Sequence, residues 1–258
     1  MTIQVKKSVP SGTIVLNRPE KRNALTRQMM TELSQALNDL HGEKQVRAVI
    51  LIGAGSAFCA GMDLAEMQET ASQPDAQEQW YDDSLQYREL IEQMLQFPKP
   101  IIAAVNGPAL AGGAGLLLAS DLVIATESAK FGLPEPKRGI VAGIVSPLLA
   151  FRVGGGMATH LLLRANTIEA QQALSLGIYH ELIADDLIWA KAHEMAQEIA
   201  QSAPEAIQLT KRMIYENIGE QMLTQLSAGA AVSATARTTE AAAEGLAAFF
   251  EKRTPKWK

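Results

Sequence analysis

Residues 101 to 139 constrain the fold of this chain more than any other stretch. Two short apolar runs, Ile101–Val105 and Leu122–Ala125, have the length and composition of buried strands. Between them lie a glycine-rich segment and the apolar run Leu116–Ala119, which is good helix-forming sequence. The spacing predicts a strand, a tight turn and then a helix whose first turn is built from Gly112 to Gly115.

The first turn of that helix carries chemistry as well as structure. Its backbone N–H groups have no partners inside the helix, and glycines leave them uncrowded. Such groups can point at a substrate oxygen that is becoming negative. Glu135 follows the second apolar run by ten residues and lies between Pro134 and Pro136. An amide donor and a carboxylate on one scaffold can form an enolate and handle its proton.

Composition limits the class of protein. The chain has 258 residues, of which 47% are hydrophobic, so it can bury the core of one large domain with a small appendage. Its net charge of −5 argues against nucleic acid or a membrane surface as the main partner. One cysteine, Cys59, excludes an intramolecular disulfide. With no signal peptide or membrane-spanning run in the sequence, we expect a cytoplasmic protein.

Two strands followed by one helix recur along the chain, which predicts a layered α/β core. The further expected elements are a hairpin of Ile3–Lys6 and Thr13–Leu16, a helix with Thr26 as N-cap, a strand at Ala48–Ile52, a loop at Thr70–Gln79 and a helix spanning Leu85–Leu95. From Asp185 onward the sequence is almost entirely helical in pattern. We place a boundary near residue 202, between a core at 1–202 and a helical region at 203–258.

Five stretches in register resemble the crotonase superfamily, the enoyl-CoA hydratase/isomerase family. They are Leu16–Leu25, Ala57–Leu64, Val105–Asp121, Phe131–Glu135 and Glu244–Trp257. The resemblance implies a spiral of ββα units followed by a C-terminal helical trimerisation region. It also implies an acyl-CoA thioester as substrate, no cofactor apart from the coenzyme A of that thioester, and assembly as a homotrimer or a dimer of trimers.

The same resemblance assigns roles to individual residues. The backbone N–H groups of Met62 and Gly112 would bind the thioester oxygen, and Glu135 would act as acid and base. Removal of one such donor typically costs about 3 kcal/mol of transition-state stabilisation. The residues expected around the coenzyme A are Lys21, Arg22, Ala24, Ala60, Asp63 and Leu64, together with Phe250 and Lys252 of the C-terminal tail, which would cover the coenzyme A of a neighbouring subunit.

One departure from the family pattern bears on the reaction. Family hydratases hold the attacking water between two glutamates, and the first of these would fall at Gly115 here. Family isomerases that move a double bond manage with one carboxylate at the Glu135 position, and some branched-chain hydratases share this pairing of glycine with glutamate. Double-bond shift and hydration therefore both remain open. The alternatives are decarboxylation, retro-Claisen cleavage, or acyl-CoA binding without turnover.

Each candidate also has a purely structural interpretation. Glu135 could be a surface carboxylate paired with Lys137 or Arg138, and Met62 could be a core methionine. We interpret Cys59 as a buried structural thiol and Asp63 as a carboxylate at a helix N-terminus.

Two further site classes are disfavoured by the sequence. The strand Ala48–Ile52 followed by Gly53-Ala-Gly55 is similar to a dinucleotide-binding turn, but Phe58 stands where the third glycine would be and no helix follows at once. The four histidines are scattered without metal-ligand spacing, so no metal is expected.

Overall fold

The strands of the chain form two sheets. In the computed structural model, which describes residues 1–257 and all their side chains except those of 216–220, six strands pair in the order β1-β2-β3-β4-β6-β9 and three in the order β5-β7-β8. The strands are β1 (Ile3–Ser8), β2 (Ser11–Leu16), β3 (Ala48–Gly53), β4 (Ile101–Val105), β5 (Ala109–Leu110), β6 (Leu122–Thr126), β7 (Lys130–Gly132), β8 (Thr167–Glu169) and β9 (Glu181–Ile183). β1 and β2 are antiparallel, and the other pairs of the larger sheet are parallel.

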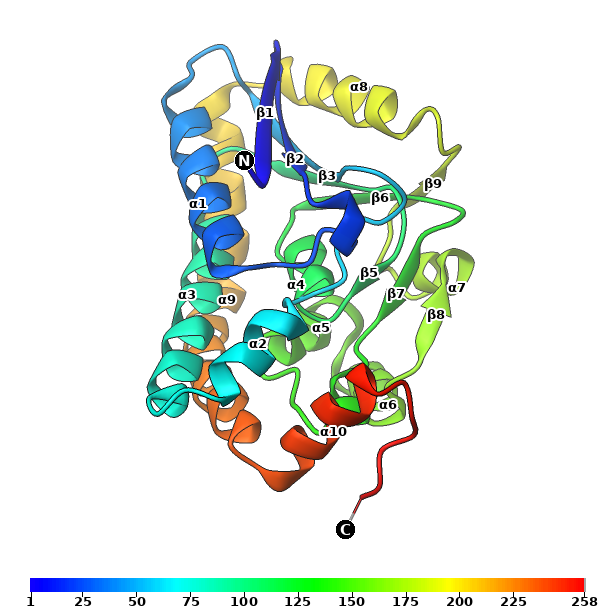
Figure 1. The fold of residues 1–258 in the computed structure, drawn as a ribbon. Helices are drawn as coiled ribbons and strands as arrows, with labels where there is room; N and C mark the ends of the chain where they lie inside the picture. The colour runs from blue at the N-terminus through cyan, green and yellow to red at the C-terminus, as the bar shows by residue number, and fades with distance from the viewer. Residues whose placement is uncertain (258) are drawn as a thin grey trace.

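Helices surround these sheets (Figure 1). They are α1 (Arg27–Gly42), α2 (Leu64–Ala71), α3 (Ala76–Gln96), α4 (Gly112–Leu118), α5 (Val145–Val153), α6 (Gly155–Arg164), α7 (Ala170–Ser175), α8 (Ile188–Ala200), α9 (Pro204–Arg237) and α10 (Glu240–Phe250), with 3-10 turns η1 (Pro19–Lys21) and η2 (Glu135–Arg138). Within the described residues, no helix combines the length and hydrophobicity needed to cross a membrane.

The inner strands of the larger sheet, β3, β4 and β6, are buried on both faces because they are apolar at successive positions. Ile50 and Ile102 face one side, where they meet Ala192 of α8. Leu51 and Ala103 face the other side and belong to the main core. Parallel strands covered by helices on both faces have this continuous apolar pattern.

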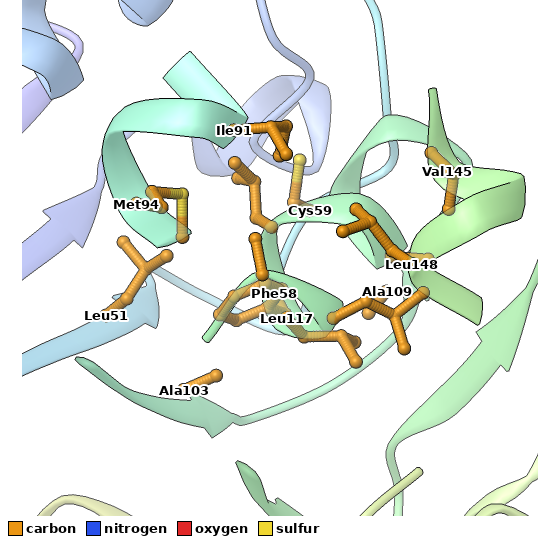
Figure 2. Close-up of a cluster of buried hydrophobic side chains, with 14 of the residues drawn as sticks. Leu51, Phe58, Cys59, Ile91, Met94, Ala103, Ala109, Leu117, Val145 and Leu148 are labelled. Carbon is orange, nitrogen blue, oxygen red and sulfur yellow. The ribbon is translucent and has the colours of Figure 1, made fainter. Parts of the chain in front are cut away.

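The main core lies between the sheet and the helices α1, α3 and α4. Figure 2 shows how its side chains meet, with Leu51 of β3, Ile91 and Met94 of α3, Leu117 of α4 and Leu148 of α5 around Phe58 and Cys59. Helix α9 packs along α3, and α1, α3 and α9 lie side by side in Figure 1. The helices from both ends of the chain therefore frame the same core.

A second set of strand pairings stacks beside the larger sheet. Met62 pairs with Leu25, Cys59 pairs with Ala109, and β7 joins β5 to β8. Each repeat of the chain adds one strand to the larger sheet and one extended segment to the second set of pairings, and then forms a helix. This arrangement is a spiral of ββα units. The predicted fold class is confirmed, and Met62 and Gly112 come from successive turns of this spiral.

Two expectations about segments need comment. The loop predicted at Thr70–Gln79 is too long, since α2 continues to Ala71 and α3 begins at Ala76, so only residues 72–75 connect the two helices. The boundary predicted near residue 202 falls between α8 and α9, but Leu226 of α9 belongs to the main core. The division into 1–202 and 203–258, and the trimerisation role of the second part, stay predictions.

Candidate active site

A cavity of about 320 Å³ opens where the spiral turns meet η2 and the C-terminal helices. Met62, Gly112 and Glu135 all line it. Of the residues expected around coenzyme A, Lys21, Arg22, Ala24, Ala60, Asp63, Leu64 and Phe250 line the same cavity, whereas Lys252 does not. The volume is in the range of small-molecule sites.

The pairing of residue 62 leaves its N–H group available. Leu25 donates its N–H to the carbonyl of Gly61 at 2.8 Å and accepts from the N–H of Asp63 at 2.8 Å. These two bonds use the groups on either side of Met62, so its own N–H faces away from Leu25. No backbone hydrogen bond from Met62 N–H occurs among the described residues.

The N–H of Gly112 is available for a different reason. Gly112 is the first residue of α4, where N–H groups lack an intrahelical acceptor, and its N–H makes no backbone bond in the part of the chain described. Ala111, just before it, has φ +51° and ψ −126°, which is a strained conformation for a residue with a side chain. A Cβ built on Gly61 would lie 3.1 Å from the Gly112 nitrogen, so the two turns are in close contact.

Tyr87 of α3 also belongs to the site, although no sequence motif predicts it. Its hydroxyl donates a 2.5 Å hydrogen bond to the carbonyl of Gly112. A Cβ built on Gly115 would lie only 1.9 Å from the Tyr87 oxygen. The tyrosine therefore occupies the space that any side chain at position 115 would enter. Burial, together with the nearby Cys59 and Glu135, raises the pKa of Tyr87, so its phenol is neutral.

Glu135 begins η2 and points into the site from the opposite turn. Its side chain is buried, at 6% exposure, and its Oε2 atom has no hydrogen-bond partner among the described residues. Burial raises its pKa to about 7, opposed by a hydrogen bond from its own backbone and by the charge of Arg138. A carboxyl group with that pKa can accept and return a proton near neutral pH.

The interpretation of Glu135 as a surface ion pair is wrong. Lys137 donates instead to Asn166 at 2.7 Å. Arg138 forms no ion pair with Glu135 in the described structure, and its guanidinium lies 5.1 Å from the centre of the Phe249 ring. The buried, unpaired carboxyl follows from the apolar neighbours Leu133 and Ile144 and from its position between two prolines.

Close backbone contacts fix the segment that follows Glu135. Gly139 and Gly143 pass so near α10 and α9 that a Cβ on them would lie 2.2 Å from the carbonyl oxygen of Ala241 and 2.3 Å from that of Gly229. A Cβ on Gly245 of α10 would lie 2.2 Å from the carbonyl oxygen of Arg138. These glycines let the C-terminal helices approach the main chain directly.

Two of the structural interpretations agree with the observed contacts. Asp63 is the N-cap of α2, accepts from the N–H of Ala65 at 3.0 Å and forms an ion pair with Arg18 at 2.9 Å. Cys59 is fully buried, and burial raises its pKa to about 12, which leaves its thiol unreactive as a nucleophile.

The candidate dinucleotide turn at 53–55 is filled by protein. Asn106 accepts from the N–H of Gly53 at 3.0 Å and donates to the carbonyls of Gly53 and Gly55 at 2.9 Å each. Asn23 donates to the carbonyl of Ala54. A phosphate would need N–H donors, and the N–H of Gly53 is already bound to Asn106 and that of Ala54 to the carbonyl of Leu16 at 2.8 Å. Within residues 1–257, no three His, Cys, Asp or Glu side chains group as a metal site requires, and the expectation of no metal stays a prediction.

The cations expected near coenzyme A differ in their surroundings. Lys21 and Arg22 are exposed on and after η1 at the cavity edge. Lys252 follows α10 outside the cavity, and Phe250 lines the cavity of its own chain. The proposed contact of the last two with a neighbouring subunit stays a prediction.

Comparisons with known proteins agree with this architecture. Residues 7–258 match the family described as Enoyl-CoA hydratase/isomerase. A putative enoyl-CoA hydratase of Thermus thermophilus is 41% identical, over 99% of this chain and 100% of that protein. A 1,2-epoxyphenylacetyl-CoA isomerase of Escherichia coli is 32% identical, over 95% of this chain and 94% of that protein. The crystal structure of an enoyl-CoA hydratase/isomerase from Pseudoalteromonas atlantica superposes with a TM-score of 0.87 at 31% identity, with both chains covered completely.

Proposed function

The chain belongs to the enoyl-CoA hydratase/isomerase family, and from this premise we propose that it converts enoyl-CoA thioesters through an enolate with Glu135 as its single acid–base group. The observation that carries the proposal is the buried Oε2 of Glu135, which has no protein partner in the described structure and lines one cavity with two unused N–H groups. A buried carboxyl without a partner is costly to maintain, and a catalytic role explains why it is kept.

In this proposal the N–H groups of Met62 and Gly112 bind the thioester oxygen. Negative charge gathers on that oxygen when a proton leaves C2, so both hydrogen bonds strengthen as the enolate forms. The strained turn at Ala111 and the bond from Tyr87 hold Gly112 in place before substrate arrives. The donors therefore need little rearrangement during the reaction.

The reaction best supported by one carboxyl group is a double-bond shift. Glu135 as carboxylate takes the C2 proton of a 3-enoyl thioester, and the electron pair of that bond moves onto the thioester oxygen. The protonated Glu135 then delivers the proton to C4 while the carbonyl reforms and the double bond settles between C2 and C3. No water is consumed, and the carboxylate is restored.

Tyr87 supports a mechanism with a single carboxyl group. Its hydroxyl fills the space that a side chain at residue 115 would occupy, and it donates its hydrogen bond to the Gly112 carbonyl. Because burial raises its pKa, it does not act as a base near neutral pH. Tyr87 is thus a positioning residue, and proton transfer falls to Glu135 alone.

Hydration is the second candidate, because the Thermus relative is named a putative enoyl-CoA hydratase. Glu135 could take a proton from water as the water oxygen adds to C3, and then give that proton to C2 of the enolate. The Tyr87 oxygen retains lone pairs that could accept the other proton of such a water.

The remaining parts of the proposal concern the substrate and assembly. Lys21 and Arg22 lie where they could meet the phosphates of coenzyme A, and Leu64 and Ala24 supply apolar surface nearby. We expect no cofactor beyond the coenzyme A of the substrate, and a homotrimer or dimer of trimers.

Product analysis with 2-enoyl- and 3-enoyl-CoA esters tests the reaction directly. Wild type should interconvert the two isomers, and Glu135→Gln should lower kcat by at least 100-fold. Equal rates for the two proteins would remove Glu135 from the mechanism. Formation of a 3-hydroxyacyl product instead would select hydration, and turnover of neither ester would favour decarboxylation, retro-Claisen cleavage or simple binding.

A pair of substitutions at residue 112 tests the N–H donor. A Cβ on Gly112 meets only ordinary contacts at 3.6 Å, so Gly112→Ala should keep near-normal activity. Gly112→Pro removes the N–H, but a residue before proline avoids the φ of +51° that Ala111 has, so the melting temperature of this variant is measured beside its activity. We expect it to lower kcat/KM by about 100-fold or more. Equal activity of the two variants would contradict the role of this donor.

A further inference from the structure

Arg237, the last residue of α9, is a buried cation with unused hydrogen-bond donors. Its side chain is 9% exposed and lines the same cavity as Glu135. It makes no hydrogen bond with any described residue, and its one ion contact is with Asp83 Oδ2 at 3.8 Å. A guanidinium group always carries its charge and offers five N–H donors, and those of Arg237 are left open at the cavity wall instead of being paired with described residues.

Asp83 does not supply that explanation, because Arg27 already holds it. Arg27 donates from Nε to Asp83 Oδ1 at 2.5 Å and from Nη2 to Oδ2 at 2.9 Å. This bidentate pair satisfies the carboxylate. Arg237 is therefore a second positive charge on one carboxylate, and at 3.8 Å it is too far from Asp83 to hydrogen-bond with it.

Arg237 contacts α3, the helix that carries Tyr87. Asp83, which it faces, precedes Tyr87 by one helical turn of α3, and Tyr87 contacts Gly112 at the proposed reaction centre. Residues one turn apart on a helix are about 5–6 Å apart. Lys21 and Arg22 come instead from η1, where the carbonyl of Arg22 accepts from Ala60 N–H. Arg237 and the residues proposed for the coenzyme A phosphates therefore come from different elements of the cavity wall.

The cavity offers Arg237 no other counter-charge. Its acidic lining residues are Glu20 on η1, Asp63, which Arg18 binds, and Glu135. Arg138 also lines the cavity, and its Nε atom is buried without a hydrogen-bond partner in the described structure. Arg138 and Arg237 thus both line a cavity in which Glu135 is the one buried acidic residue of the described chain.

We propose that Arg237 binds a carboxylate at the far end of the acyl chain, so that the preferred substrate is a short-chain enoyl-CoA that ends in an acid group. The inference rests on the proposed function and adds its substrate class. A carboxylate matches the planar donor fork of arginine, and the surrounding burial strengthens the pair. Arg237 lies 3.8 Å from Asp83, and Asp83 is one helical turn of α3, about 5–6 Å, from Tyr87, so we expect an acyl chain of about six carbons or fewer.

The test uses pairs of substrates that differ in one group. Six-carbon enedioic acids are joined to coenzyme A at one end, with the double bond at C2 or C3, and compared with the esters of the matching enoic acids, which end in methyl. Wild type should show a kcat/KM at least 10-fold higher for the acid-terminated esters. Arg237→Met should lose about 10- to 100-fold on these esters, the factor that corresponds to a lost charge-assisted hydrogen bond, and less than 3-fold on the methyl-terminated ones.

Two further variants separate binding from folding. Arg237→Lys should recover part of the acid preference, because it keeps the charge without the fork. Arg88→Met removes another largely buried arginine between α3 and α9, which bonds Ser227 outside the cavity, and should leave the preference unchanged. Melting temperature and size-exclusion profile are measured for each variant.

The outcomes test the carboxylate subsite at Arg237 separately from the proposed conversion of enoyl-CoA thioesters. Turnover of methyl-terminated esters without preference for the acid would overturn the subsite and leave the function intact. Equal losses on both ester types in Arg237→Met would also overturn it, by assigning Arg237 a structural role. If wild type converted none of the four esters, the proposed function itself would fail.

Discussion

Replacing Glu135 by glutamine should stabilise the protein while it abolishes turnover. The carboxyl is buried at 6% exposure without a hydrogen-bond partner on Oε2 in the described structure, so ionising it inside the fold is unfavourable. Glutamine has nearly the same shape and never carries the charge. The gain in the free energy of unfolding should therefore begin above the ordinary glutamate pKa, where the unfolded chain ionises Glu135 and the folded protein resists doing so.

The magnitude follows from the pKa of Glu135, which burial raises from 4.5 to about 7. Each factor of ten in proton affinity corresponds to about 1.4 kcal/mol, so the whole change is worth about 3 kcal/mol. The folded protein binds this proton more tightly than the unfolded chain does. The contribution of this proton to the free energy of unfolding is thus fully present below pH 4.5 and is lost as the pH rises toward 7. Relative to wild type, Glu135→Gln should gain about 1 kcal/mol at pH 5 and about 3 kcal/mol at pH 8.

Urea denaturation at pH 5 and pH 8, at one fixed protein concentration, measures this difference. Glu89→Gln is the matched control, since the Glu89 side chain is 66% exposed and the chemical change is the same. A difference between wild type and Glu135→Gln that stayed constant between the two pH values would refute the reasoning. So would an equal pH dependence in the control.

Three other predictions follow from the same geometry. For double-bond shift, kcat/KM of wild type should rise as the pH rises through about 7, because Glu135 must be ionised to accept the C2 proton, and a flat profile would contradict this. Gly115→Ala places its Cβ 1.9 Å from the Tyr87 oxygen and should lower the free energy of unfolding by about 1–3 kcal/mol. That cost should shrink when Tyr87→Phe is combined with it in a double-mutant cycle, and an undiminished cost would argue against the contact. Ala111→Gly should raise the free energy of unfolding by about 1 kcal/mol by relieving the φ of +51°, yet lower kcat because Gly112 is less firmly held; an unchanged melting temperature would rule out strain there.

The sequence predicts the fold well where its signals are local. Ile101–Val105 is an unbroken apolar run next to glycine, and the strand has those bounds. The helix after it begins at Gly112, as the glycine spacing predicts. The polar stretch at 70–79 predicts too long a loop because α3 begins there with exposed or half-buried residues. The first buried residues of α3 are Trp80 and Asp83, which tertiary contacts fix.

The site is only partly visible in the sequence because its contacts are nonlocal. Tyr87 falls on the apolar stripe of α3 with Ile91 and Met94, so periodicity predicts a core residue, which it is. Nothing in that pattern reveals that its hydroxyl fills the space beside Gly115. Likewise, whether Glu135 is buried or exposed depends on elements far away along the chain.

The glycine contacts around Glu135 join the turn that follows it to the C-terminal helices. Gly139 and Gly143 lie against α10 and α9 with no room for an added methyl group, so a shift of either helix must displace the turn that carries Glu135. With Glu135 as the proposed acid–base group, we expect natural variation in the C-terminal region to affect catalysis, even at residues that never meet a substrate. We expect subunit assembly and reaction chemistry to evolve together in this protein, since α9 and α10 would contribute to both.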